Sequence, residues 1–400
     1  MAVLGVLGHA RFAGYTAANG TAFAAAWMYR LALGWAIWEA THSGLWLGLL
    51  AICDLGPALI FGPLGGVWGD RAGPANVIVR AQSLVILSML LVGFAIWVGA
   101  PPYLLLLLSL LSGSAVTSED AARAVIATEL VPEDDKGAAV AMTAVVINLA
   151  RFTGPALAGV LAAWGGLVWI FPIAAVLGVP LALFAAFSRV PHHRAGTDRS
   201  LLGELADALA YARRDRLIGL ILISFLLSCL LVRPIYELVP ALVGRIYDKD
   251  IVGLSIMTTA IGLGAMVAGA VMLRKRDARQ AGQVHFIGAL TGGALMPMLA
   301  LTPGFAGAVL LCAGLGFAIA LCAIAAQIVV QLGSDAALRN RMLALWSIIL
   351  RFGPAIGALA IGALGDALGF RAPLIAVGLL AILCAAGLLF VFRRRLVRAD

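Results

Sequence analysis

The stretch Arg151-Phe152-Thr153-Gly154-Pro155, which closes with Gly159, is the first copy of a pattern that decides the fold of this chain. The second copy starts 200 residues later and reads Arg351-Phe352-Gly353-Pro354, closing with Gly357. Each copy lies inside a long apolar run, where an arginine costs about 2.5 to 3.5 kcal/mol on insertion scales. The same costly residue at the same place in both halves indicates a duplicated membrane bundle with a shared polar interior.

The composition excludes a water-soluble fold. Of the 400 residues, 62% are hydrophobic and 12% are charged, and the mean hydropathy is +1.03. Soluble domains have about 45–50% apolar and about 25% charged residues. Alternating strand-like segments are scarce, which argues against a membrane barrel. We therefore predict an all-α membrane protein.

Twelve apolar stretches are long enough to cross a hydrocarbon core about 30 Å thick. They lie at residues 12–38, 44–69, 75–98, 102–129, 137–163, 167–188, 217–243, 251–273, 283–301, 304–331, 340–364 and 371–392. We predict two six-helix bundles related by pseudo-two-fold symmetry, residues 1–188 and 217–400. The arginine-rich linker between them, 189–216, contains an apolar helical face within 201–214, which predicts an amphipathic helix on the inner membrane surface.

The basic residues predict the orientation. The net charge is +8, and 21 of the 28 Lys and Arg residues fall on one side of the twelve predicted spans. Because basic loops stay cytoplasmic, we expect both termini in the cytoplasm and the chain in the cytoplasmic (inner) membrane. This pattern accounts for the positive charge without nucleic acid as a partner.

The five cysteines all lie inside apolar runs, and none has metal-ligand spacing. No nucleophile triad, phosphate loop or haem signature is present. We predict no metal, no cofactor and no enzymatic activity.

The loop at residues 65–73 reads Gly-Gly-Val-Trp-Gly-Asp-Arg-Ala-Gly. It resembles the signature loop between helices 2 and 3 of the major facilitator superfamily. The resemblance implies a cytoplasmic gate in which Asp70 latches onto the positive N-terminus of helix 11, while glycines let helices 2 and 11 approach closely. The expected gate residues are Gly66, Gly69, Asp70, Arg71, Gly73 and Arg123. The alternative is an ordinary solvated turn.

Three further stretches narrow the resemblance. Residues 27–35, 129–133 and 148–159 are similar to the enterobactin-exporter-like branch of this superfamily, and the fifth-helix segment also resembles the Gly-Pro motif of drug/proton antiporters. The resemblance covers nearly the whole chain. It implies a secondary transporter that works by alternating access, driven by protons, with efflux of a siderophore, a drug or a metabolite.

The Gly-Pro pairs of the repeated pattern remove side-chain bulk and one backbone hydrogen bond each. We expect a bendable, tightly packed helix in each half. The residues concerned are Gly154, Pro155, Gly159, Gly353, Pro354 and Gly357. The alternative is helix packing with no role in coupling.

One carboxylate is expected well inside a span. Asp54 lies about 21 Å from the inner end of helix 2, and Arg30 lies about 27 Å from the inner end of the antiparallel helix 1. Burial favours the protonated form of a carboxylate and a nearby arginine favours the ionised form. If Arg30 moves, Asp54 can therefore capture or release a proton, and we hypothesise that it is the proton-coupling site. The alternative is a static ion pair.

The remaining polar residues of the spans are candidates for the substrate cavity. Asn19 shares a helix face with Arg30, Arg233 and Glu237 lie four residues apart, and Arg151 and Arg351 lie near mid-depth. The full set is Asn19, Arg30, Asn148, Arg151, Arg233, Glu237, Gln327 and Arg351. Arginines outnumber acids among them, which favours an anionic or polar-aromatic substrate. Alternatively, the mid-depth arginines pair with Asn148, Gln327 and backbone carbonyls.

Two other classes of protein stay open. A non-transporting membrane receptor or assembly factor can retain this fold, although interior charges in both halves argue against it. An integral-membrane enzyme normally needs His or acidic residues clustered at one interface, which are not evident. For the transporter we expect a monomer whose partners are a small-molecule substrate, protons and the lipid bilayer.

Overall fold

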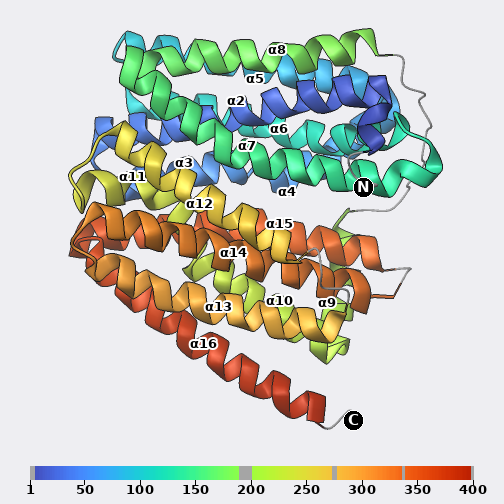
Figure 1. Ribbon diagram of the computed structural model, residues 1–400, viewed down its shortest axis with the longest axis vertical. Helices are drawn as coiled ribbons and strands as arrows, with labels where there is room; N and C mark the ends of the chain where they lie inside the picture. The colour runs from blue at the N-terminus through green and yellow to red at the C-terminus, as the bar shows by residue number, and fades with distance from the viewer. Residues whose placement is uncertain (1–4, 189–200, 273–276, 336–337, 398–400) are drawn as a thin grey trace. The chain divides into compact units, whose positions relative to one another are not determined.

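The computed structural model describes residues 5–188, 201–272, 277–335 and 338–397. Every regular element in these ranges is a helix, which confirms the predicted all-α membrane fold (Figure 1). The first part of the predicted linker, residues 189–200, lies outside the described residues.

The chain divides into two compact units. Unit 1 consists of Met1–His42, Ile52–Thr197 and Asp250–Thr259, and unit 2 consists of Ser43–Ala51, Asp198–Lys249 and Ala260–Asp400. In unit 1 the described elements are η1 (Val6–Gly8), α2 (Ala10–Thr41), α4 (Ala58–Ala72), α5 (Pro74–Trp97), α6 (Pro102–Glu129), η2 (Glu133–Asp135), α7 (Lys136–Gly165), η3 (Leu167–Trp169) and α8 (Ile170–Phe187). In unit 2 they are α9 (Leu201–Arg214), α10 (Arg216–Leu231), α11 (Ile235–Arg245), α13 (Ala278–Leu301), α14 (Phe305–Gly333), α15 (Arg339–Leu368) and α16 (Arg371–Val397).

Two helices belong to both units. The first part of α3 (Gly44–Leu55) belongs to unit 2 and its end to unit 1, whereas α12 (Ile251–Met272) begins in unit 1 and continues in unit 2. These are the second helices of the two predicted halves, so the crossover occurs at the same place in each repeat. The boundaries proposed for the halves, 1–188 and 217–400, remain a prediction.

Two predicted spans are interrupted by proline. The span 44–69 is broken at Gly56-Pro57, where α3 ends and α4 begins, and the span 217–243 is broken before Pro234, between α10 and α11. Proline has no N–H to donate and its ring clashes with the preceding turn. Asp54 therefore lies at the end of a short helix, directly before the first break, rather than in the middle of a continuous one.

Eleven helices in the described residues are long and apolar enough to cross a membrane. The first predicted span, α2, is not among them, although its 32 residues are more than long enough. Its buried residues include Asn19 and Tyr15, which lower its hydropathy but lie inside the bundle. α2 packs along α8 and α7, and α5 runs beside α8 (Figure 1).

The predicted amphipathic helix exists as α9, and protein covers part of its apolar face. Ala208 is fully buried, in a cluster with Ile218 of α10 and Met342 of α15. Asp207 pairs with Arg341 at 2.6 Å. The helix is thus anchored to unit 2 rather than held only by the membrane surface.

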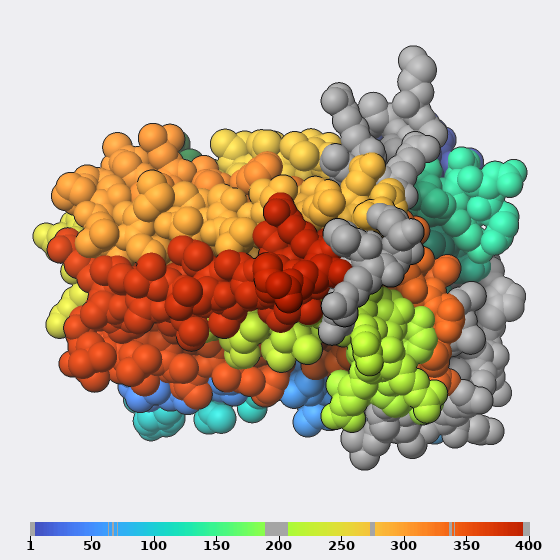
Figure 2. Space-filling model, turned by 90° about the horizontal axis from the view of Figure 1, so that it is seen from below, coloured from blue at the N-terminus to red at the C-terminus, as the bar shows by residue number. Residues whose placement is uncertain are grey.

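Exposed apolar side chains mark the surface that faces lipid. Figure 2 shows α16 as a continuous band of side chains flanked by α13 and α10. Its Leu383 is 70% exposed and Phe390 is 57% exposed. No water-soluble surface needs such a stripe, and acyl chains accommodate it.

Candidate functional site

The first copy of the repeated motif contributes to a cluster of charged and aromatic side chains in unit 1. The guanidinium carbons of Arg30 and Arg151 each lie 5.3 Å from the ring centroid of Trp27. Arg30 also pairs with Asp54 at 3.0 Å. The side chains of Arg30 and Asp54 are 28% and 18% exposed. This group, Trp27, Arg30, Asp54 and Arg151, is called the Trp27 cluster below.

Glycine explains how Arg151 reaches Trp27. A Cβ on Gly154 would lie 2.7 Å from both the carbonyl oxygen of Ala24 and the Cβ of Trp27. The absent side chain lets α7 pack directly on α2 beside the indole. Asp54 is held in a similar way, because a Cβ on Gly113 of α6 would lie 2.4 Å from the Asp54 carbonyl oxygen.

Gly159 and Pro155 of this motif contact the beginning of α12. The Ser255 hydroxyl donates a hydrogen bond of 2.6 Å to the Pro155 carbonyl. A Cβ on Gly159 would lie 2.1 Å from the same hydroxyl. Both contacts lie within unit 1.

The second copy of the motif makes the matching helix contact in unit 2. A Cβ on Gly353 would lie 2.8 Å from the Cβ of Cys229, and one on Gly357 would lie 2.2 Å from the Leu230 carbonyl oxygen. α15 therefore packs on α10 as α7 packs on α2. Gly353 faces Cys229, whereas Gly154, the matching glycine of unit 1, faces Trp27. Arg351 is half-buried in unit 2.

A second polar cluster, which we call the Arg123 network, fills the core of unit 1. Arg123 of α6 donates to Asn19 of α2 at 3.0 Å and to Gln82 of α5 at 2.9 Å, and it pairs with Glu119 one turn away. Glu119 is fully buried. Its second carboxylate oxygen has no hydrogen-bond partner among the described residues.

Further contacts complete the Arg123 network. Tyr15 donates to the Arg123 carbonyl at 2.7 Å, and the guanidinium lies 4.8 Å from the ring centroid of Phe23. Gln82 also donates to the Gly178 carbonyl of α8 at 3.2 Å. Arg123 thus connects α6 to α2 and α5 directly, and to α8 through Gln82. Asn19 and Arg123, predicted at different sites, contact each other here.

The corresponding helices of unit 2 carry a neutral polar cluster, the His285 network. His285 of α13 is fully buried between Ser224 of α10, 2.9 Å from its Nε2, and the Cys322 carbonyl of α14, 3.0 Å from its Nδ1. The Cys322 thiol in turn donates to Ser228 at 3.5 Å. No charged side chain is among these four residues.

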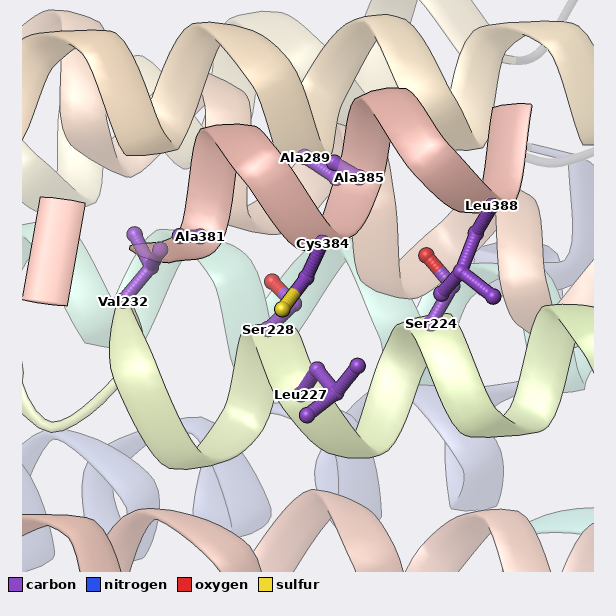
Figure 3. Close-up of a pocket in the computed structure, with 9 residues that line it drawn as sticks. All are labelled: Ser224, Leu227, Ser228, Val232, Ala289, Ala381, Cys384, Ala385 and Leu388. Atoms are coloured by element: carbon purple, nitrogen blue, oxygen red, sulfur yellow. The ribbon is translucent and has the colours of Figure 1, made fainter. Parts of the chain in front are cut away.

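A small cavity lies beside the His285 network. Figure 3 shows it between α10 and α16, with Ser228 and Cys384 facing each other across it. Its volume is about 10 Å³, enough for roughly one water molecule. It is too small for a substrate, so it is a packing gap of unit 2.

The gate residues divide into described and undescribed positions. The surroundings of Gly66 and the side chain of Asp70 lie outside what the structure describes. No heavy atom of the described residues lies within 4 Å of a Cβ built on Gly69, and its role in the gate remains a prediction. Gly73 has φ +86°, which requires glycine, and it joins α4 to α5. Arg71 is exposed.

Four other predicted cavity residues lie outside both clusters. Asn148 donates to the Ala144 carbonyl of its own helix at 2.9 Å. Arg233 lies in the break before α11, with its guanidinium 5.5 Å from the Tyr236 ring centroid, whereas Glu237 lies in the first turn of α11. The break means that the two are not one turn apart on a single helix. Gln327 is half-buried in α14.

A carboxylate at the end of α15 is a contact that the sequence did not suggest. Asp366 accepts hydrogen bonds from the Ser43 hydroxyl at 2.6 Å and from the backbone N–H groups of Gly44 and Leu45 at 2.7 and 3.0 Å. It therefore caps the N-terminus of α3. A Cβ on Gly48 of α3 would lie 2.4 Å from the Cα of Leu359 of α15, so these two helices are in close contact next to the cap.

Comparisons with known proteins identify the class. The profile of the Major Facilitator Superfamily matches residues 15–338, so the chain belongs to this superfamily of secondary transporters, which are not enzymes. It is a multi-pass membrane protein with a small-molecule substrate.

Two curated relatives are siderophore transporters. The enterobactin exporter EntS of Shigella boydii serotype 4 (strain Sb227) is 25% identical over 331 residues, covering 81% of this chain and 78% of that protein. The staphyloferrin A transporter of Staphylococcus aureus (strain NCTC 8325 / PS 47) is 25% identical over 139 residues, only about a third of either chain (34% and 35%).

Solved structures share the fold at low sequence identity. The nucleoside transporter NupG (D323A mutant) has a TM-score of 0.75 at 13% identity, covering 96% of this chain and all of that chain. A POT family transporter in complex with 5-aminolevulinic acid has a TM-score of 0.73 at 13% identity, with 96% of both chains covered.

Proposed function

We propose that this chain is a proton-coupled exporter of a small anionic organic molecule with aromatic character. The observation that carries the proposal is the Trp27 cluster. Two guanidiniums lie against one indole and a carboxylate pairs with one of them, and their charges sum to +1. An anion is attracted by the excess charge, and a flat ring is accommodated against the indole and guanidinium planes.

The relatives support the class of cargo. One exports enterobactin and the other transports staphyloferrin A. We therefore place siderophores first among the candidate substrates, before drugs and other metabolites, and we take export as the direction.

The Arg30–Asp54 pair supports proton coupling. An ion-paired carboxylate stays ionised, and it binds a proton more readily once the arginine is withdrawn. In the substrate-free state, movement of Arg30 away from Asp54 would let Asp54 take up a proton, and the return of Arg30 would release that proton before the anion binds, so that substrate and proton bind in turn. The break at Gly56-Pro57 directly after Asp54 gives the backbone there freedom to move.

Alternating access needs contacts that form in one state and open in another. Asp366 capping α3 is one such contact, and the predicted Asp70 latch is a second. The basic-residue pattern supports an inner-membrane location with both termini in the cytoplasm, and we propose that one chain suffices for transport.

Reconstituted vesicles test the proposal. Purified protein should move enterobactin or staphyloferrin A against a concentration difference only when a proton gradient is imposed. Asp54→Asn should abolish this driven flux and retain exchange down a gradient, because the site can no longer take up a proton. Asp248→Asn, the same change at an exposed loop position, is the matched control. Full proton-driven flux in Asp54→Asn would exclude Asp54 as the coupling site.

The substrate site has its own test. Arg151→Gln should raise the KM about tenfold, because a hydrogen bond to a charged group contributes about 1.5–3 kcal/mol. Arg245→Gln, at an exposed position of α11, should leave the KM unchanged. Binding without flux in every condition would instead favour the receptor alternative.

A further inference from the structure

An open hollow lies between α4, α5 and α6 of unit 1. Its volume is about 340 Å³. The walls are mainly apolar, and two arginines and one tryptophan stand among them. The lining residues are Trp68, Arg71, Ala72, Val77, Arg80, Ala81, Leu84, Ala115 and Ser118. None of these nine is acidic.

Two of the helices around the hollow are in close contact at Ser118, which lines it. A Cβ on Gly65 of α4 would lie 2.1 Å from the carbonyl oxygen of Ser118 of α6. α4 and α6 therefore touch at a residue that lines the hollow, and the Gly73 turn joins α4 to α5.

The position of Arg80 shows that the hollow borders on lipid. Arg80 is exposed, and on the same face of α5 follow Leu87, Leu91 and Phe94, which are 49%, 39% and 58% exposed. This stripe is the face that α5 presents to acyl chains. Arg80 lies six residues into the helix, about 9 Å from its start, within reach of the headgroup level for a long side chain.

The chemistry of the lining matches one kind of lipid. Arginine forks bind phosphate through paired hydrogen bonds, and two of them give a net positive mouth. Trp68 is 41% exposed and is of the type that gathers at the membrane interface. The apolar walls below the arginines suit an acyl chain and do not suit a free phosphate ion.

We propose that this hollow binds one anionic phospholipid. Its phosphate lies between Arg71 and Arg80, and one acyl chain fills the space along Ala81, Leu84 and Ala115. A lipid held in this way bridges α4 and α5 beside the turn that joins them. The binding is independent of the proposed transport activity.

Quenching of Trp68 tests the proposal on the full-length protein. The chain is placed in phosphatidylcholine nanodiscs that contain brominated phosphatidylglycerol or brominated phosphatidylcholine. The fluorescence of Trp68 is obtained as the difference in tryptophan fluorescence between the parent and Trp68→Phe. Phosphatidylglycerol should quench Trp68 more strongly, and each arginine removed should lower this preference about fivefold.

The variants separate the outcomes. Arg80→Gln should lower the preference, and the Arg71→Gln/Arg80→Gln double variant should abolish it. Arg80→Lys should keep part of the preference, and Arg214→Gln on α9 should keep all of it. Ala81→Leu keeps both arginines but fills the hollow, and it should also lose the preference. Native mass spectrometry should show one retained phosphatidylglycerol fewer in the double variant than in the parent. Inorganic phosphate should not displace this phosphatidylglycerol from the parent. Equal quenching by the two lipids, or a preference unchanged in the double variant, overturns the proposal.

Discussion

The Arg123 network of unit 1 and the His285 network of unit 2 occupy corresponding helices but differ in charge. Both join the first, third and fourth helices of their half through buried polar side chains. Unit 1 uses a buried ion pair, and unit 2 uses an imidazole, hydroxyls and a thiol. A repeat therefore preserves the place of a polar contact without preserving its charge.

The charge makes unit 1 more sensitive to substitution. A buried ion pair is costly to form, and removing one partner leaves an unpaired charge in a medium that cannot solvate it. Neutral hydrogen bonds carry a smaller penalty when one partner is lost. Single substitutions in the two networks should therefore lower the free energy of unfolding by different amounts.

The largest effect is expected from Arg123→Leu. It strands the fully buried Glu119 and removes the partners of Asn19 and Gln82, so the free energy of unfolding should fall by about 3–5 kcal/mol. Thermal unfolding in detergent with a fluorescent thiol probe measures it. The double variant Glu119→Leu/Arg123→Leu removes both charges and should be more stable than the single one. A single variant as stable as the parent would show that the ion pair contributes nothing to unit 1.

An intermediate effect is expected from the paired glycines of the two motifs. Gly154→Ala meets a carbonyl oxygen and a Cβ at 2.7 Å, so it should cost about 1–3 kcal/mol. Gly353→Ala meets one Cβ at 2.8 Å and should cost less. Gly387→Ala, where no heavy atom lies within 4 Å, is the control and should be neutral or stabilising. The same unfolding assay ranks the three variants, and equal values for all three would contradict the close contacts.

The smallest effect is expected from His285→Leu. It leaves the Ser224 hydroxyl without its imidazole partner, but a helical serine can turn to a carbonyl of its own helix. The loss should be about 1 kcal/mol, measured by the same assay with Leu388→Ile as a packing control. A loss as large as that of Arg123→Leu would remove the distinction between the two networks.

The sequence predicted the helices well because the hydropathy of a spanning helix adds up over all its residues. An apolar run of about 20 residues is a property of the whole run, so the ends of α5, α6 and α16 fall close to the predicted limits. The proline breaks at Pro57 and Pro234 were missed because a spanning helix can tolerate proline, and only tertiary packing decides whether it is interrupted.

The polar sites were predictable in part. Charges in apolar runs identified Arg30, Asp54 and Arg151. In the structure both arginines contact Trp27, and Asp54 pairs with Arg30. That tryptophan was not singled out, because one aromatic residue among many in a membrane helix carries no signal of its own. Glu119 was not recognised as fully buried, because the sequence does not show whether a carboxylate near the inner end of a span faces the core.

The cap that Asp366 places on α3 also makes this carboxylate a chemical reporter. It lies near the C-terminal end of its own helix, where the helix dipole repels a negative charge, and the N–H groups of α3 compensate for that repulsion. Once α3 departs, the carboxylate loses its shield and becomes open to reagents such as carbodiimides. Labelling at one side chain thus records, in an otherwise unmodified chain, how often the beginning of α3 leaves α15.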